Sequence, residues 1–531
     1  APSPAQRVSV RGSTLDADST ASGDSAGGAG DVAVHAFTVA VSNHGFISAD
    51  TVDGDGGDVA VYADTVVLFE DGSISSLSSG RGDSGAVTVA GFPQAGDGRQ
   101  LRPASLITMD SGASISVDSR ASGDTGLIRI SANAVLMIGG ATISASSQDG
   151  ANSSSGIVLL ANDLFVADAT INVSTQGSEN ASLLFILGTD SELSDPIVAR
   201  PANSIVLSIG SEVSTASTSP QANAGRAAEI FLLADSIALE GAAILGTTSA
   251  GEGGQISLFG ERIELRNQSI INTSTAGAGS AGRIELGARV EGTVVDITQS
   301  TVSSDSSASG SAGDVEVRAS SLAVLDAQIS SAASASGGAG SITVSGDDFV
   351  LSSGALVVSS QQSRGGSISL RLSNDLRIED AVVSAASRAT ASEAPGGNIV
   401  IGQPNLAILN RSQLSADANA GAGGNIDLRA QTLVRSADTL ITATSASNID
   451  GRVAIEAVDD LNVRVLEVPS PQVQAPVSLA GNCDRRPGTK ASTLVVEAVS
   501  QSMLPNLIGQ DTTVEPANLI KGGAGIGDCG S

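Results

Sequence analysis

The sequence is dominated by a repeated unit in which a glycine precedes short runs of alternating apolar and polar residues. In GSAGDVEVRASSLAVLDAQISSAASASGGAG (310–340), three such runs are separated by small and polar residues, and the next stretches repeat the pattern. Units start at intervals of 26 to 31 residues, at Gly254, Gly282, Gly313, Gly340, Gly366, Gly397, Gly424 and Gly451. A period of this length indicates a solenoid, in which each unit is one structural repeat.

Alternation within the runs predicts β-strands with one inward and one outward set of side chains. The third run forms a column of similar hexapeptides, such as SISVDS (114–119) and TISASS (142–147), which a β-sandwich would not produce. Regular Asn-Gly or Asp-Gly hairpin turns are missing. We therefore predict an all-β, right-handed parallel β-helix of about fifteen three-strand coils, with Ile115, Ile143 and Ile171 stacked directly over one another. Glycine is expected to supply unusual backbone dihedral angles at the corners.

Composition and charge limit the core and the partners. The 531 residues include no Trp, one Tyr and nine Phe, while 41% are hydrophobic, so the core must be slender and built from Val, Ile, Leu and Ala. A formal net charge of −29 argues against binding of nucleic acid or anionic membranes, and it permits divalent cations. No apolar run reaches about 18 residues, so no transmembrane helix is predicted.

Two longer segments that contain proline, 91–105 and 186–204, interrupt the period. We expect both to be loops that leave a corner of the coil on one face. Such insertions often form the binding surface of a solenoid, but a tolerated insertion without a role is equally consistent with the sequence.

The chain divides into a predicted rod, residues 1–468, and a segment without the repeat, residues 469–531, which we expect to cap or anchor the rod. The first residues read as the end of a coil, as if a longer precursor had been cut. Both cysteines, Cys483 and Cys529, lie in the C-terminal segment. An isolated pair suggests one disulfide and an oxidising compartment, with two unpaired thiols as the alternative.

One candidate binding motif is the tripeptide Arg81-Gly82-Asp83, within GRGDS. Some host integrins read this tripeptide. A chain rich in Gly and Asp also produces it by chance, and a plain turn at a corner accounts for the same residues.

A second candidate site is the Gly-rich turn DTVDGDGGD (50–58), which contains Asp53, Asp55 and Asp58. Carboxylate oxygens on such a turn suit Ca²⁺. The nonapeptide period of calcium-binding β-rolls is missing, so solvated turn residues are the alternative. No other cofactor is expected.

Catalysis is not predicted. Glycan-active sites need paired carboxylates, often with a Lys or Arg, and aromatic platforms. The repeat region contains no Lys, the chain has no Trp, and His35 and His44 stand alone in the sequence. His35 lies in an alternating run and is read as an outward strand residue. Nucleophile-elbow, zinc-protease, P-loop and Cys-x-x-Cys motifs are missing as well.

Units such as AGDVEVRASSLAVLDAQISSAASASGGAGSITV resemble the repeats of filamentous-haemagglutinin-like exoproteins of the two-partner secretion type, long surface proteins of cyanobacteria and other Gram-negative bacteria. The resemblance covers about residues 5–468, and the segment from GNCDRRPGTK onward resembles the Cys-containing end of such proteins. It implies a secreted or surface-attached rod exported through an outer-membrane transporter. The secretion domain of the family is not evident in this chain.

These observations predict a secreted or cell-surface adhesin-type rod that mediates attachment or aggregation, with a cell-surface or glycan ligand of unknown identity. The first alternative is a self-assembling subunit of an extracellular filament, sheath or surface layer, which would associate end to end through open strand edges. A glycan-active β-helix enzyme is the second alternative. It requires a groove with paired acidic residues and a nearby Arg.

Overall fold

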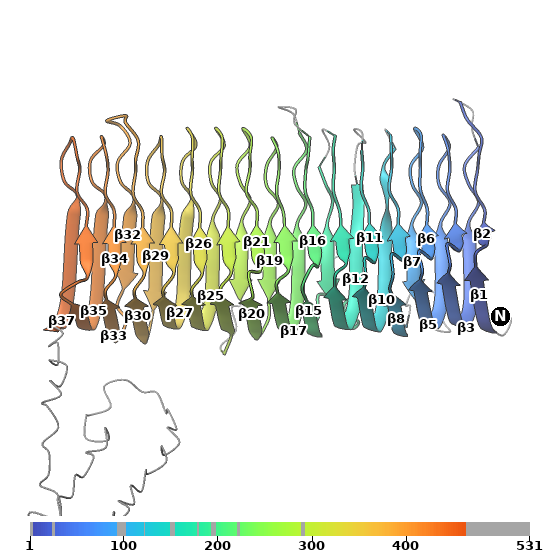
Figure 1. Cartoon of the computed structure of the whole chain (residues 1–531), viewed down its shortest axis with the longest axis horizontal. Helices are drawn as coiled ribbons and strands as arrows, with labels where there is room; N and C mark the ends of the chain where they lie inside the picture. The colour runs from blue at the N-terminus through green and yellow to red at the C-terminus, as the bar shows by residue number, and fades with distance from the viewer. Residues whose placement is uncertain are drawn as a thin grey trace, which may run out of the picture. The chain divides into compact units, whose positions relative to one another are not determined.

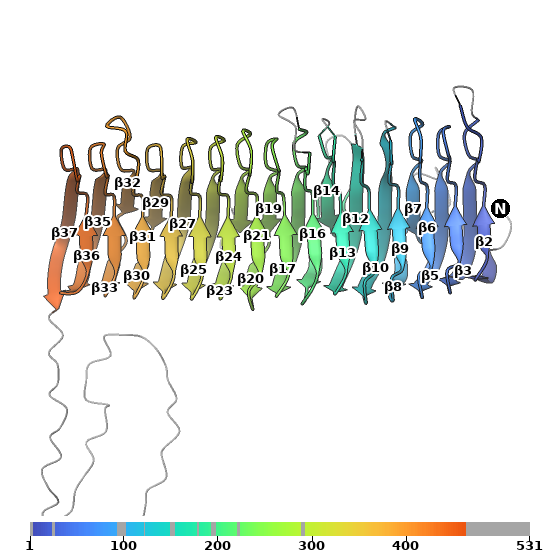
Figure 2. The same cartoon turned by 45° about the horizontal axis from the view of Figure 1, so that its top comes forward.

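The computed structural model describes residues 4–463 apart from 24–26, 93–101, 122, 149–153, 178–179, 193–197, 220–223 and 288–291. The chain divides into two units, Ala1–Val465 and Leu466–Ser531; the boundary predicted from the sequence lay after residue 468. The described residues of the first unit form 37 β-strands and no helix. The strands stack in parallel as about fifteen coils of a β-solenoid (Figure 1, Figure 2). The predicted fold class is therefore confirmed.

One parallel sheet of 22 strands contains the longer strands of every coil. Its strands are β1 (Ala5–Arg11), β3 (Val32–Ser42), β5 (Val59–Phe69), β7 (Val87–Ala90), β8 (Ala104–Met109), β10 (Thr125–Ile138), β12 (Ser154–Ala167), β14 (Leu184–Leu187), β15 (Ala202–Leu207), β17 (Ile230–Glu240), β19 (Ile256–Phe259), β20 (Arg262–Arg266), β22 (Ile284–Gly287), β23 (Val294–Thr298), β25 (Val315–Leu325), β27 (Ser341–Ser352), β29 (Ser367–Leu372), β30 (Asp375–Glu379), β32 (Asn398–Gly402), β33 (Leu406–Asn410), β35 (Asn425–Ser436) and β37 (Arg452–Val463).

A second parallel sheet of 15 strands contains one three-residue strand from each coil. Its strands are β2 (Thr14–Asp16), β4 (Phe46–Ser48), β6 (Ser73–Ser75), β9 (Ser114–Ser116), β11 (Thr142–Ser144), β13 (Thr170–Asn172), β16 (Glu212–Ser214), β18 (Ala243–Leu245), β21 (Ile270–Asn272), β24 (Thr301–Ser303), β26 (Gln328–Ser330), β28 (Ala355–Val357), β31 (Val382–Ser384), β34 (Gln413–Ser415) and β36 (Leu440–Thr442). A third ladder of single-residue parallel bridges runs from Ser19 to Ser445.

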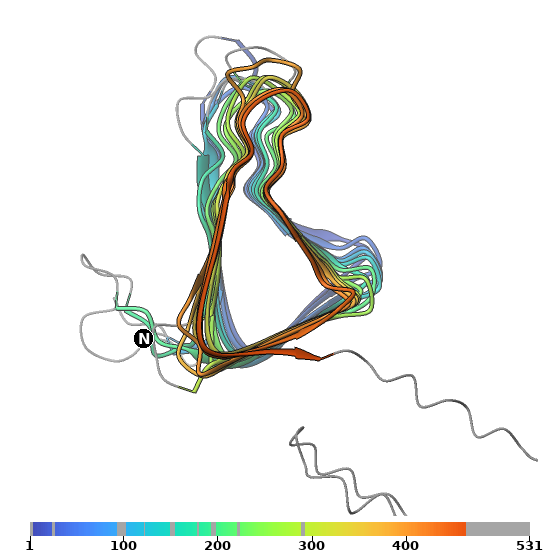
Figure 3. The same cartoon turned by 90° about the vertical axis from the view of Figure 1, so that its left-hand side faces the viewer.

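Each coil is a triangle with a projecting loop, which we call the arm (Figure 3). In β25, the alternation of buried and exposed side chains changes phase after Ala319, because the strand bends there and its two halves form two faces. The short strand β26 forms the third face, and the arm follows it before β27 begins. The coils wind in a right-handed sense along the axis (Figure 3).

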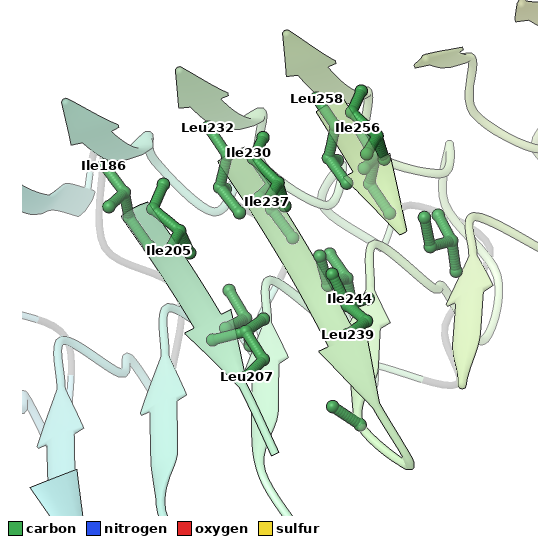
Figure 4. Packing of buried hydrophobic residues seen from close by; sticks show 14 of the residues in the cluster. Ile186, Ile205, Leu207, Ile230, Leu232, Ile237, Leu239, Ile244, Ile256 and Leu258 are labelled. Carbon is green, nitrogen blue, oxygen red and sulfur yellow. The ribbon is translucent and has the colours of Figure 1, made fainter. Parts of the chain in front are cut away.

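The interior is one continuous aliphatic core that every coil extends. Ile115 pairs in register with Ile143, and Ile143 pairs with Ile171. All three side chains are fully buried. The same inward stacking recurs in other coils, as the side chains of Ile186 and Leu232 illustrate (Figure 4). The predicted column of isoleucines is confirmed, and period-two alternation is its cause.

The repeat glycines in the middle of the chain are required by close packing, whereas the unusual dihedral angles predicted for glycine occur at the corner before the short strand, as at Gly112 and Gly241, with φ of 76° and 67°. A Cβ atom on Gly313 would lie 1.8 Å from the carbonyl oxygen of Gly282, and one on Gly340 would lie 2.0 Å from that of Gly313. None of these three glycines has a positive φ. The Gly313 amide also donates to the Ser304 carbonyl at 3.0 Å, across the neck of the arm. At the base of the arm, Gly313 lies so close to Ser304 and to the backbone of Gly282 that no side chain fits.

Positive φ angles occur instead at the corner between the long and the short strand, mostly on residues other than glycine. Asp326, Ser353 and Asp380 occupy equivalent positions there, with φ of 50°, 51° and 51°. Asp and Asn tolerate this left-handed region better than most residues. The corner therefore accounts for the Asp, Asn and Gln residues that precede the third run.

Candidate functional site

The insertion at 188–201 leaves the solenoid at the corner between the two halves of the long strand. Ile186 pairs with Leu232 of β17. After the insertion, Ala202 pairs with Ala234, which lies only two positions beyond Leu232. The insertion therefore separates Leu187 from Ala202, whereas the equivalent residues of the neighbouring coil follow each other directly in the chain.

The second insertion leaves the same corner three coils earlier. Ala90 pairs with Tyr62 of β5, and Leu106 pairs with Thr65, so the insertion is 91–103. The expected placement of both loops at one corner is thus found. Their predicted bounds were too wide, because regular strand pairing already holds the flanking residues in β8, β14 and β15.

Beside the 188–201 insertion lies a second hydrophobic cluster, outside the solenoid. Val158, Leu160 and Leu187 point away from the core, yet they are 5%, 3% and 1% exposed. Partly buried apolar side chains surround them, namely Leu127, Leu183, Phe185, Ala199, Phe231 and Leu233. Ala199 belongs to the inserted loop, so this cluster attaches the loop to the outer face of the sheet.

A row of three aromatic rings crosses the edge of this external cluster. The ring centroids of Phe185 and Phe231 are 5.7 Å apart, and those of Phe231 and Phe259 are 5.5 Å apart, both edge to face. This surface was not among the features predicted from the sequence. The sequence feature that indicates it is the loss of apolar and polar alternation in SLLFIL (182–187) and IFLLA (230–234), where the outward positions are apolar too.

Further along the solenoid, outward positions on both halves of the long strand are charged and paired. Arg266 Nη2 lies 3.1 Å from Asp296 Oδ2 and 3.4 Å from Glu264 Oε2. In the following coils, Arg283 pairs with Glu285 at 2.7 Å and also contacts Glu316. These pairs are partly exposed, and such pairs individually contribute little to stability. Both faces therefore carry positive and negative side chains side by side in these coils.

Aspartates at one outward position after the short strand tie neighbouring coils together. Asp50, Asp118 and Asp305 each accept a backbone amide and a Ser hydroxyl from the next coil. Burial raises the pKa of all three carboxyls, and the hydrogen bonds offset part of that rise. At Asp417, burial also raises the pKa, but donors from Thr444, Thr442 and Ser415 outweigh it, so the pKa is lowered.

The Arg81-Gly82-Asp83 motif lies on an arm, with both charged residues exposed. Asp83 Oδ1 accepts the backbone amide of Asp124 at 2.8 Å, and the Asp83 amide donates to Asp55 Oδ1 at 3.2 Å. A Cβ atom on Gly82 would lie 2.0 Å from a backbone oxygen of the preceding arm. Each of these contacts serves the stacking of arms, which supports the turn interpretation of the motif.

The three carboxylates of the predicted Ca²⁺ site do not converge. Asp53 Oδ2 accepts the amide of Gly23 at 2.8 Å, whereas Asp58 Oδ1 accepts that of Ala86 at 2.8 Å. Asp53 and Asp55 line a cavity of about 530 Å³ that Asp58 does not reach. Within the described ranges, no group of three or more His, Cys, Asp or Glu side chains is placed to hold a metal ion.

The remaining predicted residues are placed as follows. His35 points outward from β3, and its ring lies 4.9 Å from that of Tyr62. His44 lies at a corner, with Nδ1 3.4 Å from Asp71 Oδ2. Cys483 and Cys529 lie outside the described residues, so their pairing stays a prediction.

Comparisons with known proteins found no matching family, no matching curated protein and no matching solved structure. The structure contains, in the part described, no helix long and apolar enough to cross a membrane. The resemblance to filamentous-haemagglutinin-like exoproteins therefore stays a hypothesis.

Proposed function

We propose that this chain is an adhesin-type rod, secreted or displayed at a bacterial cell surface, which mediates attachment or aggregation. The observation that carries the proposal is the placement of both insertions, 91–103 and 188–201, at one corner of a regular shaft. Stiff solenoids commonly present binding surfaces on loops that extend from one face. Export by the two-partner route is part of the same proposal.

The external apolar cluster supports this function. A loop without a role needs no contact with the shaft, but the 188–201 insertion packs Ala199 against the outward-pointing cluster of Val158, Leu160 and Leu187. Packing of this kind orients a loop and lowers the entropy lost when it binds a ligand.

Attachment is tested with beads that carry the full chain, applied to cultured host cells, bacterial cells and glycan-coated plates. Deletion of 188–201 joins Leu187 directly to Ala202, as Leu233 joins Ala234 in the next coil, and deletion of 91–103 is the matched variant. We expect attachment by the full chain and at least one deletion to reduce it, with the circular dichroism of a β-protein retained. Beads that attach no better than albumin-coated beads would contradict the proposal.

Assembly into a filament is the second candidate. Val458 and Leu461 on β37 are 84% and 53% exposed, and β37 pairs with β35 alone among the described strands. Exposed apolar strand edges favour addition of further strands. Electron microscopy of the purified chain separates the candidates, because uniform filaments support assembly and single rods support the plain adhesin.

A further inference from the structure

A cavity of about 470 Å³ opens on the outer face of the solenoid, where β29, β32 and β35 lie side by side. Arg371 of β29 pairs in register with Gly402 of β32. Gly402 follows Ile401, which pairs with Leu428, so Gly402 lies level with Arg429 of β35. Since neighbouring strands are about 4.8 Å apart, the two arginines stand on strands about 10 Å apart with a residue lacking a side chain between them.

The fold itself does not require glycine at position 402. A Cβ atom there would meet only the carbonyl oxygen of Leu370, at an ordinary contact distance of 3.6 Å, and the φ of Gly402 is not positive. The repeat glycines differ, because a Cβ atom on Gly397 would lie 1.9 Å from a backbone oxygen. Glycine inside a strand weakens the strand and often marks a place where a ligand approaches closely. At this position its effect is to keep the cavity open.

The two arginines beside the cavity differ in their ion pairs. Arg429 lies 3.1 Å from Asp427 Oδ2 and 3.5 Å from Glu456 Oε2. The exposed guanidinium of Arg371 has no ion pair or hydrogen bond within the described part of the chain. Asp427 also lines the cavity, and its Oδ1 has no hydrogen-bond partner among the described residues. Arg371 is the uncommitted, bidentate donor that the lining offers to an anionic group.

The walls of the cavity combine apolar and hydrogen-bonding groups. Val400, 43% exposed, forms an apolar wall, and Ser373 and Gln403 contribute polar side chains. A second cavity of about 640 Å³ shares Gln403 and Arg429 and continues toward β37. Small-ligand sites commonly have this size and this mixture of apolar surface with a few polar groups.

We propose that the cavity over Gly402 binds a carboxylate-bearing sugar unit, such as an acidic residue at the end of a surface glycan. Arg371 holds the carboxylate, Val400 packs against a C–H face of the ring, and the polar wall takes up hydroxyl groups. A single terminal unit fits better than a polyanion, because the net charge of −29 repels long acidic chains. The inference rests on the proposed role in attachment and names the ligand class for it.

The test is titration of the full chain with sodium glucuronate, followed by isothermal calorimetry and by NMR of the sugar, with glucose and methyl glucuronate ester as uncharged probes. We expect saturable binding of glucuronate and clearly weaker binding of both uncharged sugars. Arg371→Ala should weaken binding about tenfold or more, because it removes a charge-assisted hydrogen bond, and Arg371→Lys should restore part of the affinity. Gly402→Leu fills the cavity and should also weaken binding.

The matched control is Arg388→Ala, which removes an exposed arginine on an arm, away from this face, and should leave the affinity unchanged. Equal affinity for glucose and glucuronate, unchanged binding in Arg371→Ala, or no saturable binding would each overturn the proposal. The measurement on Arg371→Ala can overturn the proposal by itself, even if Gly402→Leu fails to fold. The bead assay is independent of this titration: attachment of the beads without saturable glucuronate binding would refute this site and leave the adhesin function standing.

Discussion

Asp118 of one coil accepts a hydrogen bond from Ser144 Oγ of the next coil, and the two oxygen atoms are 2.6 Å apart. The same carboxylate accepts the backbone amide of Ser146 at 2.7 Å. Asp50 and Asp305 repeat this relationship elsewhere along the shaft. Neighbouring coils are therefore joined by buried carboxylates as well as by the backbone ladders, and this arrangement makes stability depend on pH.

Asp118→Asn tests that dependence. Burial raises the pKa of Asp118, so the folded chain holds this proton more tightly than the unfolded chain does. The contribution of the group to stability is therefore complete below the ordinary Asp pKa of about 3.9 and is lost as pH rises through the raised folded value. We expect the unfolding free energy of the wild type, minus that of the variant, to fall as pH rises above about 4 and then to level off. Urea unfolding at several pH values measures this difference, and a flat difference would contradict the assignment.

Gly313→Ala should destabilise the solenoid. The new Cβ atom would lie 1.8 Å from the Gly282 carbonyl oxygen, so backbone of two coils must move, at a cost of about 1–3 kcal/mol or more. Gly402→Ala is the matched control, because its Cβ atom meets no close contact; it should leave stability unchanged or raise it by roughly 0.5 kcal/mol. Thermal and urea unfolding of both variants give the comparison. Equal losses at the two positions would refute the close-packing argument.

Ile329→Ala should weaken the core locally. Ile329 is fully buried and stacks between Val302 and Leu356. Truncation of such a residue costs about 2–5 kcal/mol, and in a repeat protein the loss is felt mainly by adjacent coils. Amide hydrogen exchange should become faster in the coils next to residue 329 and stay unchanged near Ile115. Uniformly faster exchange along the shaft would contradict this prediction, because it would mean that the coils unfold together and not locally.

Ser119→Ala should not destabilise the protein. Ser119 belongs to the bridge ladder inside the arms, where it is completely buried and its hydroxyl has no hydrogen-bond partner among the described residues. Removal of an unsatisfied buried hydroxyl is neutral or stabilising, by roughly 1 kcal/mol at most. Urea unfolding of the wild type and of Ser119→Ala measures the difference in unfolding free energy. A loss of stability would mean that an ordered water or another partner satisfies Ser119.

The solenoid was predictable because each coil repeats the same local requirements. Alternation at Ile115, Ile143 and Ile171 places one side chain per coil in the core, and identical spacing brings these positions into register. Length and proline content likewise identified the two insertions. The sequence also indicated a corner of the coil for both, but strand pairing in the structure was needed to show that they share the corner between the two halves of the long strand.

The external surface was not predictable in the same way. Leu160 and Leu187 come from separate coils, and Ala199 comes from a loop. Arg371 and Gly402 are neighbours only because the register of two strands places them so. A pattern within one unit says which side chains point outward, but it does not say which outward side chains of different units meet.

The sequence by itself determined the fold class, the number of coils and the residues of the core, because those depend on a local period that every unit repeats. Only the tertiary structure decided where glycine is indispensable and where it leaves space. Gly313 and Gly402 are the same residue type, yet one lies against the backbone of the preceding coil and the other forms the floor of a cavity. That difference arises because a Cβ atom on Gly313 would point at the backbone of the stacked coil, whereas one on Gly402 would make only an ordinary contact, and a single unit does not encode what the neighbouring coil places there.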